Sequence, residues 1–224
     1  NSHDYEEDLG FIVREALRLS SGKKITALGI GVAVVLDEDR SEIVYAENLP
    51  SWVGKSVVED LATRLGCQVY MENDAVAMGY GEAFYGETQG DFDFIIWGTG
   101  IGGAEIRYEG SRVQVLGKEW SAYFKNWEMQ DGGRRLGLEY GKPTTDFTQE
   151  DWQKVSERFK QNILAYCQEC SPAGLVFGGG LADLHSEILL GMASDVMVPI
   201  AVSKFGNDSG LVGGFSLIKQ GMAR

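Results

Sequence analysis

The chain has 224 residues, 44% of them hydrophobic and 24% charged, which is the composition of an ordinary globular protein of one large domain or two small lobes. Its net charge of −13 argues against nonspecific binding to nucleic acid by these residues, because that binding depends on cationic side chains. No apolar run approaches the ~18 residues of a membrane span, and three cysteines predict reduced thiols in a cytoplasmic protein.

The first part of the chain alternates between helical and extended patterns, which predicts an α/β lobe. Residues 5–20 carry apolar side chains at helical spacing, and residues 25–35 form a nearly continuous apolar run, typical of a strand buried on both faces. A short strand over 42–46, a loop over 48–52, a helix over 56–65 and a strand over 67–71 are predicted to follow. Ser56 and Glu59 fit a capping box at the start of the second helix.

A polar triplet, Glu72, Asn73 and Asp74, stands between that strand and a predicted helix over 75–84. Asp74 is therefore expected at a helix N-terminus, where a carboxylate is electrostatically favoured. Spacing alone leaves two interpretations open. Asn73 and Asp74 are either functional groups or simply the cap of the helix.

A glycine-rich turn interrupts the next apolar stretch, which runs from residue 95 to residue 104. In this turn Gly98, Thr99 and Gly100 let backbone N–H groups approach phosphate oxygens without obstruction by Cβ atoms. A tight hairpin turn is the alternative interpretation of the same residues.

The polar segment 87–91 is the predicted boundary between an N-terminal lobe, residues 1–88, and a C-terminal lobe, residues 89–224. In the second lobe the pattern predicts strands over 92–97, 103–108, 112–116, 173–177 and 196–202, helices over 151–168 and 184–192, and a closing helix over about 209–222 that packs back toward the first lobe. Residues 117–148 have the least regular pattern.

Six segments together resemble one family. They are Gly29-Ile30-Gly31-Val32, Asn48-Leu49-Pro50-Ser51-Trp52, Glu72-Asn73-Asp74-Ala75, Gly81-Glu82-Ala83-Phe84-Tyr85-Gly86, Gly98-Thr99-Gly100-Ile101-Gly102-Gly103 and Phe177-Gly178-Gly179-Gly180. Their order is that of the ROK family, which groups sugar kinases with sugar-responsive repressors. The resemblance spans residues 25–220 and implies the two-lobed actin-like ATPase (ribonuclease H-like) α/β fold. The family's opening hairpin, with its Asp-x-Gly-Gly-Thr phosphate loop, is absent, so we expect this fold to be N-terminally incomplete.

The resemblance also implies roles for individual residues. Asp74 is the expected catalytic base, which accepts a proton from the sugar hydroxyl. The expected sugar-binding residues are Asn48, Asn73, Glu119 and Glu139. The expected nucleotide-binding residues are Gly98, Thr99, Gly100, Gly178, Gly179 and Gly180. Mg²⁺ is expected to accompany ATP, as in the family.

Three departures from the family pattern are visible. Ala122 stands where the family has a sugar-binding histidine, and Ala33-Val34-Val35 replaces its Pro-Gly-Pro. The family's zinc motif is missing, so we expect no zinc and interpret Cys167 and Cys170 as half-buried free thiols.

We therefore expect a sugar kinase domain that transfers a phosphoryl group from ATP or polyphosphate to a hexose. The alternatives are the sugar-sensing domain of a ROK transcriptional regulator and a degenerate pseudo-kinase that only binds sugar. The expected ligands are a sugar and a nucleotide, without a membrane. Nucleic acid is expected only with an upstream DNA-binding domain, and a homodimer is expected because relatives commonly dimerise.

Overall fold

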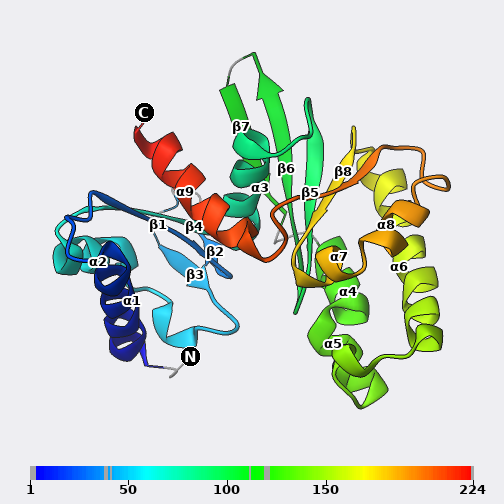
Figure 1. Ribbon diagram of the computed structural model, residues 1–224, viewed down its shortest axis with the longest axis horizontal. Helices are drawn as coiled ribbons and strands as arrows, with labels where there is room; N and C mark the ends of the chain where they lie inside the picture. Colours follow the sequence, from blue (N-terminus) through cyan, green and yellow to red (C-terminus); the bar gives the residue numbers. More distant parts are fainter. Residues whose placement is uncertain (1–3, 38–39, 41, 111, 119–121, 223–224) are drawn as a thin grey trace. The chain divides into compact units, whose positions relative to one another are not determined.

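The computed structural model describes residues 4–37, 40, 42–110, 112–118 and 122–222 (Figure 1). The described residues group into two compact units. Unit 1 lies within residues 1–81 and 210–224, and unit 2 comprises residues 82–209. The predicted division into two lobes at residue 88 stays a prediction.

Unit 1 is built on two small sheets. Its elements are α1 (Tyr5–Ser20), β1 (Ala27–Val32), β2 (Val35–Leu36), β3 (Ile43–Tyr45), η1 (Pro50–Trp52), α2 (Val57–Leu65), β4 (Gln68–Asn73), the first part of α3 (Asp74–Tyr85) and nearly all of α9 (Ser209–Met222). β1 pairs in parallel with β4, and β2 pairs antiparallel with β3. The buried side chains of Leu9, Trp52 and Leu61 centre an apolar core to which α1, η1 and α2 contribute.

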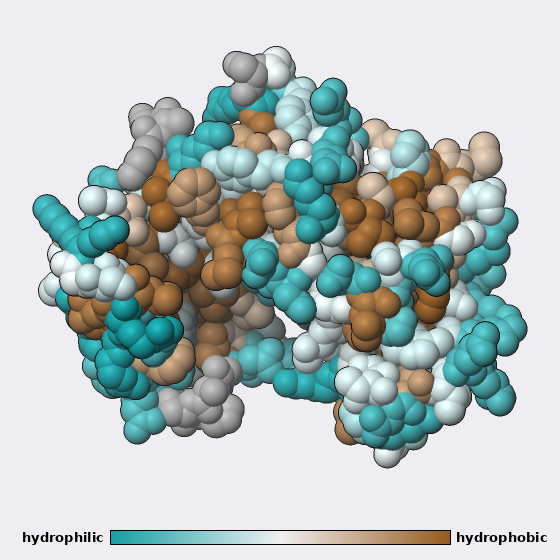
Figure 2. Space-filling view, in the orientation of Figure 1, coloured by the Kyte–Doolittle hydropathy of each residue, from teal (hydrophilic) through white to brown (hydrophobic). Residues whose placement is uncertain are grey.

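Helix α9 approaches β1 so closely that the two backbones nearly touch. A Cβ atom on Gly29 would lie 1.9 Å from the carbonyl oxygen of Gly214, so only glycine fits at this crossing. The glycine content of α9 thus serves its docking in unit 1. Figure 2 shows apolar surface along this helix, where the side chains of Leu211 and Phe215 are exposed.

Unit 2 contains a five-stranded mixed sheet of order β7-β6-β5-β8-β9. Its elements are β5 (Phe92–Trp97), β6 (Ile101–Glu109), β7 (Arg112–Gly117), α4 (Ala122–Asp131), α5 (Gly133–Tyr140), η2 (Thr144–Asp146), α6 (Gln149–Cys170), β8 (Leu175–Gly178), α7 (Gly180–Leu184), α8 (Ser186–Gly191), β9 (Ile200–Val202) and η3 (Gly206–Asp208). Strands β5, β6 and β7 form an antiparallel meander, whereas β8 and β9 run parallel to β5. The carboxyl ends of β5, β8 and β9 therefore lie at one edge of the sheet.

Aromatic side chains fill the core between this sheet and the helices α4 and α6. Trp97 stacks on Phe159 with ring centroids 4.1 Å apart, and Phe124 and Trp127 are buried against the same cluster. The sequence predicts this apolar helix face at 123, 124 and 127 because the side chains recur at helical spacing, and the structure confirms that prediction. Trp120, the fourth aromatic residue of the pattern, lies outside the described residues.

Several predicted elements differ from the structure. The apolar run 25–35 contains two strands, since the chain bends at Ala33, and β1 is half-buried where complete burial was predicted. Ser56 stands at the N-cap of α2, but its side chain makes no capping hydrogen bond, so the predicted capping box is wrong. The hydroxyl of a serine can cap only when the backbone turns it toward the first helical N–H groups.

The segment with the least regular pattern, residues 117–148, holds the helices α4 and α5. The glycines and charged residues of α5 obscure the apolar period that identifies a helix, whereas the aromatic spacing in α4 reveals its buried face. The predicted helix over 184–192 corresponds to α8, which starts only at Ser186, and the short helix α7 precedes it. The predicted strand over 196–202 begins only at Ile200.

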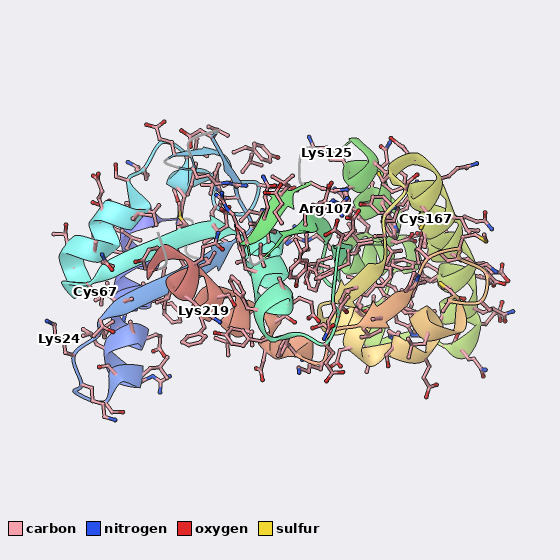
Figure 3. The ribbon with its side chains drawn as sticks, turned by 90° about the horizontal axis from the view of Figure 1, so that it is seen from above. Lys24, Cys67, Arg107, Lys125, Cys167 and Lys219 are labelled. Atoms are coloured by element: carbon pink, nitrogen blue, oxygen red, sulfur yellow. The ribbon has the colours of Figure 1, made fainter. Side chains whose placement is uncertain are left out.

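The cysteines of the chain are free thiols. Cys67 precedes β4 in unit 1, and Cys167 lies in α6 of unit 2 (Figure 3). Burial raises the pKa of Cys167 to about 11, so this thiol is protonated and weakly nucleophilic at neutral pH. Within the part of the chain that the structure describes, no helix is both long enough and apolar enough to cross a membrane.

Candidate functional site

The strand-to-helix junction of unit 1 places Asp74 at the first residue of α3. Strand β4 ends at Asn73, which is buried and uses its side chain to fix the junction. The Asn73 Oδ1 atom accepts hydrogen bonds from the N–H groups of Ala75 and Val76 at 2.9 and 3.2 Å, and Nδ2 donates to the Val34 carbonyl at 2.9 Å. The capping interpretation therefore describes what Asn73 does in this structure.

The carboxylate of Asp74 lies in the first turn of α3, half-buried, and its Oδ1 atom accepts from the N–H of Ala75 at 2.9 Å. A helix N-terminus stabilises a negative charge, because its N–H dipoles point toward it. Asp74 thus stands at a helix N-terminus and at the carboxyl end of a parallel strand, the position from which α/β proteins commonly present functional groups.

An ion pair lies beside this junction. Arg40 donates from Nη1 to Oε1 of Glu72 at 2.7 Å, and the same oxygen accepts from the N–H of Asn73 at 2.7 Å. Glu72 is buried and lies two residues before Asp74, so this ion pair forms part of the strand end that leads into the expected base. Sequence analysis did not single out Arg40, since nothing in the spacing between residues 40 and 72 indicates their contact.

The two predicted glycine turns lie side by side in unit 2. Parallel pairing aligns Ile96 of β5 with Gly178 of β8, so the turns that follow them leave the same edge of the sheet. A Cβ atom on Gly98 would lie 3.9 Å from the backbone nitrogen of Gly180. The sequence-predicted residues at 98–100 and 178–180 thus form one surface. Their role in nucleotide binding stays a prediction.

Backbone geometry requires glycine in the second turn, whereas the first turn exposes a side-chain hydroxyl group. Gly179 has a φ angle of +97°, which side-chain-bearing residues rarely adopt, and a Cβ atom there would lie 2.7 Å from the Trp97 carbonyl oxygen. Thr99 is exposed at the tip of the hairpin between β5 and β6, so its hydroxyl group faces solvent. The hairpin interpretation and the phosphate-loop interpretation of residues 98–100 are therefore compatible.

The remaining predicted sugar-binding residues are distributed over both units. Asn48 is exposed in the loop before η1 in unit 1. Glu139 of α5 in unit 2 forms a bidentate ion pair with Arg158, with both N–O distances at 3.0 Å. Glu119 lies outside the described residues. The sugar-binding role of these residues stays a prediction.

Sequence analysis missed the turn between α4 and α5, which lies against the first glycine turn. The N–H of Gly133 donates to the Gly98 carbonyl at 2.8 Å, and the N–H of Arg134 donates to the Thr99 carbonyl at 2.9 Å. The signal that could have located it is the glycine pair Gly132-Gly133 inside an otherwise irregular segment. Figure 1 shows α4, α5 and α7 at the same end of the unit 2 sheet.

The described residues hold no group of three or more His, Cys, Asp or Glu side chains that could bind a metal ion. A Mg²⁺ ion that enters with a nucleotide takes most of its ligands from phosphate oxygens and water. The donor set of this surface, with glycine backbone and one exposed hydroxyl, fits such a nucleotide-borne ion.

Comparison with known proteins identifies the family. The ROK family model matches residues 3–110. The glucokinase of Thermotoga maritima is 32% identical over 106 residues, which are 46% of this chain and 33% of that protein. The putative xylose repressor of Caldicellulosiruptor sp. is 30% identical over 148 residues, which are 64% of this chain and 32% of that protein. The match thus spans about a third of the length of each of these relatives.

The fold comparison extends over nearly the whole chain. The crystal structure of a ROK family glucokinase from Streptomyces griseus, in complex with glucose and AMPPNP, has a TM-score of 0.77 at 20% identity. The match covers 97% of this chain and 89% of that one. The fold is therefore the α/β actin-like ATPase fold of the ROK sugar kinases. Family model, relatives and fold thus agree: residues 3–110 match the ROK family model, and the chain has the fold of ROK family structures.

Proposed function

We propose that this protein is a sugar kinase that transfers the γ-phosphoryl group of ATP to a hydroxyl group of a hexose. The observation that carries the proposal is the adjacency of the two glycine turns at the carboxyl ends of β5 and β8. Thr99 and the run Gly178–Gly180 are both present, and a domain that only senses sugar does not require a nucleotide site. The similarity to glucokinases supports a hexose as the acceptor.

In the proposed reaction Asp74 accepts the proton of the sugar hydroxyl group. The hydroxyl oxygen forms a bond to the γ-phosphorus, the bond from that phosphorus to the bridging oxygen breaks, and ADP leaves with the electron pair. The first turn of α3 and the side chain of Asn73 fix the backbone that carries Asp74, so the carboxylate is oriented before the sugar binds. Mg²⁺, when bound with the nucleotide, would neutralise phosphate charge.

The side-chain amide group of Asn73 is a candidate sugar contact in this proposal. Its Oδ1 atom accepts from two backbone N–H groups of α3, whereas its Nδ2 group carries two protons, one of which reaches Val34. We propose that Asn73 contacts the sugar through the second Nδ2 proton. Asn48, Glu119 and Glu139 are kept as proposed sugar-binding residues on the family resemblance alone.

The test is an ADP-release assay on the full-length protein with a panel of hexoses. We expect turnover with at least one hexose, and we expect Asp74→Asn to lower kcat by about 10²–10⁴-fold, the range for loss of a general base. The matched control is Asp195→Asn, an exposed carboxylate of unit 2 that pairs with Lys160. Equal rates for wild type and Asp74→Asn would refute the role of Asp74.

The second candidate function is the sugar-sensing domain of a transcriptional regulator. The similarity to a xylose repressor and the Ala33-Val34-Val35 sequence favour it. This alternative predicts sugar binding without turnover, and calorimetry with sugars and AMPPNP separates the two functions. Polyphosphate as phosphoryl donor is tested by measuring formation of the sugar phosphate directly, because transfer from polyphosphate releases no ADP.

A further inference from the structure

We propose that Gly133, the first residue of α5, is a positioning residue that holds the Gly98–Gly100 turn in the shape needed for phosphate binding. The inference rests on the proposed nucleotide site and assigns a supporting role in it to the turn between α4 and α5, which acts without contacting the phosphate. All the contacts involved lie within unit 2.

Three successive hydrogen bonds join this turn to the end of β5. The indole Nε1 of Trp97 donates to the Asp131 carbonyl at 2.9 Å. The N–H groups of Gly133 and Arg134 then donate to the carbonyl groups of Gly98 and Thr99, at 2.8 and 2.9 Å. Residues 97, 98 and 99 are thus attached one after another to residues 131, 133 and 134.

These bonds determine which way the N–H groups of the glycine turn point. In a planar trans peptide the N–H points opposite to the C=O of the preceding residue. The carbonyl groups of Gly98 and Thr99 point toward α5, so the N–H groups of Thr99 and Gly100 point away from it. Neighbouring N–H groups that point the same way are the arrangement that binds phosphate oxygens in anion-binding turns.

The arrangement also explains how α5 begins. Its N-cap residue, Gly132, offers no side chain to cap the helix, and the first N–H groups of the helix donate to the carbonyl groups of the glycine turn. A helix N-terminus needs such acceptors, because its first four N–H groups have no partner within the helix. The N-terminal end of α5 therefore shapes the turn with the N–H groups of its first two residues.

Gly133 lies where the two glycine turns meet, and its lack of a side chain matters there. A Cβ atom on Gly133 would lie 2.7 Å from the Gly98 carbonyl oxygen and 3.1 Å from Cδ1 of Leu181 in α7. Leu181 follows the second glycine turn directly. A methyl group at residue 133 would therefore push the first turn away from α5 and press on the helix that follows the second turn.

The turn between α4 and α5 is itself anchored from α6. The buried carboxylate of Asp131 accepts from Arg158 Nε and from Asn162 Nδ2, both at 2.7 Å. Arg158 also donates to the Gln130 carbonyl and to Glu139. The glycine turn is thus connected, through the turn between α4 and α5, to an ion-pair network around the buried Asp131 carboxylate.

The first test compares Gly133→Ala with Gly137→Ala in the full-length protein. Both substitutions add one methyl group to α5, but a Cβ atom at residue 137 would meet only ordinary contact at 3.5 Å from the Lys142 carbonyl oxygen. By titration calorimetry with Mg²⁺ and AMPPNP, we expect Gly133→Ala to weaken nucleotide binding by about tenfold or more and Gly137→Ala to bind as wild type does. In kinetics the KM for ATP rises while the KM for the sugar is unchanged.

The second test leaves residue 133 unchanged and replaces one N–H donor with a proline ring carbon that faces the Thr99 carbonyl. Arg134→Pro removes the N–H that donates to Thr99, in the first helical turn where proline is tolerated, whereas Arg134→Ala keeps it. We expect the proline variant to bind AMPPNP several-fold more weakly than the alanine variant, although both lack the guanidinium group. If Gly133→Ala does not fold, the comparison of Arg134→Pro with Arg134→Ala tests whether the start of α5 positions the glycine turn.

The outcomes separate the two proposals. Nucleotide binding by wild type, with Gly133→Ala equal to Gly137→Ala and Arg134→Pro equal to Arg134→Ala, would overturn the positioning role and leave the kinase proposal standing. Failure of wild type to bind AMPPNP would overturn the nucleotide site itself and this inference with it.

Discussion

At the scale of single residues, Glu82 is a buried carboxyl group that ties α3 to the segment after β9. Its side chain is 3% exposed, and its Oε2 atom accepts from the Ser203 hydroxyl at 2.7 Å. Burial raises the pKa of Glu82 above its ordinary value, while the hydrogen bond from Ser203 and the charge of Lys204 oppose the rise. Glu82 therefore holds its proton more tightly in the folded protein than in the unfolded chain.

This raised pKa makes Glu82 a source of pH-dependent stability. Between its unfolded and folded pKa values the folded state binds more protons, so the contribution of Glu82 to stability falls as the pH rises through that range. Glu82→Gln keeps an oxygen that can accept from Ser203 and removes the titration. We expect the free energy of unfolding of Glu82→Gln, relative to wild type, to increase from pH 4 to pH 7, by about 1.4 kcal/mol per unit of raised pKa.

Denaturant unfolding at the two pH values measures this difference. The matched control is Glu87→Gln, an exposed carboxylate near the same helix end that pairs with Lys204. A difference between Glu82→Gln and wild type that stays constant with pH would contradict the assignment.

At the scale of elements, the N-terminal caps decide how firmly individual helices begin. Thr148 and Asp151 form a reciprocal capping box at the start of α6: the Thr148 Oγ1 accepts from the Asp151 N–H at 3.3 Å, and the Asp151 carboxylate accepts from the Thr148 N–H at 2.7 Å. Bonds to Lys142 and Thr148 lower the pKa of Asp151 to about 2. This carboxylate therefore stays charged, and its cap stays formed, until the pH falls toward that value.

We expect Thr148→Ala to lower the free energy of unfolding by about 1 kcal/mol, the usual effect of a lost N-cap. Ser56→Ala is the matched control, because Ser56 occupies the N-cap of α2 without a side-chain hydrogen bond. Urea unfolding of both variants measures the effect. Equal losses for the two variants would show that the hydrogen bond of Thr148 does not stabilise α6.

At the scale of the whole molecule, ligand binding and stability are linked by mass action. A ligand that binds only the folded state at one hundred times its Kd adds about 2.7 kcal/mol to the free energy of unfolding. For a chain of this length we expect AMPPNP with Mg²⁺ to raise the melting temperature by about 5–10 °C.

Differential scanning calorimetry with AMPPNP, with glucose and with both measures these shifts. A shift with glucose and none with AMPPNP would favour the sugar-sensing alternative over the kinase. Chelation of Mg²⁺ by EDTA is the control, and it is expected to reduce the AMPPNP shift and leave the glucose shift unchanged.

Some features of the candidate site follow from local sequence. The position of Asp74 at the first residue of α3 was predictable, because an apolar strand, a polar triplet and a helical run follow one another without interruption. The hairpin around Gly98–Gly100 was predictable for the same reason, since two apolar strands flank a glycine turn. The order of the glycine segments also identified the family, which the comparisons confirm.

Other features depend on contacts between distant residues. The ion pair of Arg40 with Glu72 joins residues 32 positions apart, and the bond from Gly133 to Gly98 joins residues 35 positions apart. The helix α5 escaped prediction, and its start is held by hydrogen bonds to the glycine turn at residues 98 and 99, which lie far away in the sequence.

By itself, the sequence determined the family, the strand and helix that flank Asp74, and the glycines that make close backbone approach possible. Only the tertiary structure decided that the two glycine turns are neighbours and that the start of α5 orients the first of them. The physical reason is that hydrophobic period and turn chemistry act over a few residues, whereas the direction of a backbone N–H group depends on which distant donor binds its carbonyl neighbour.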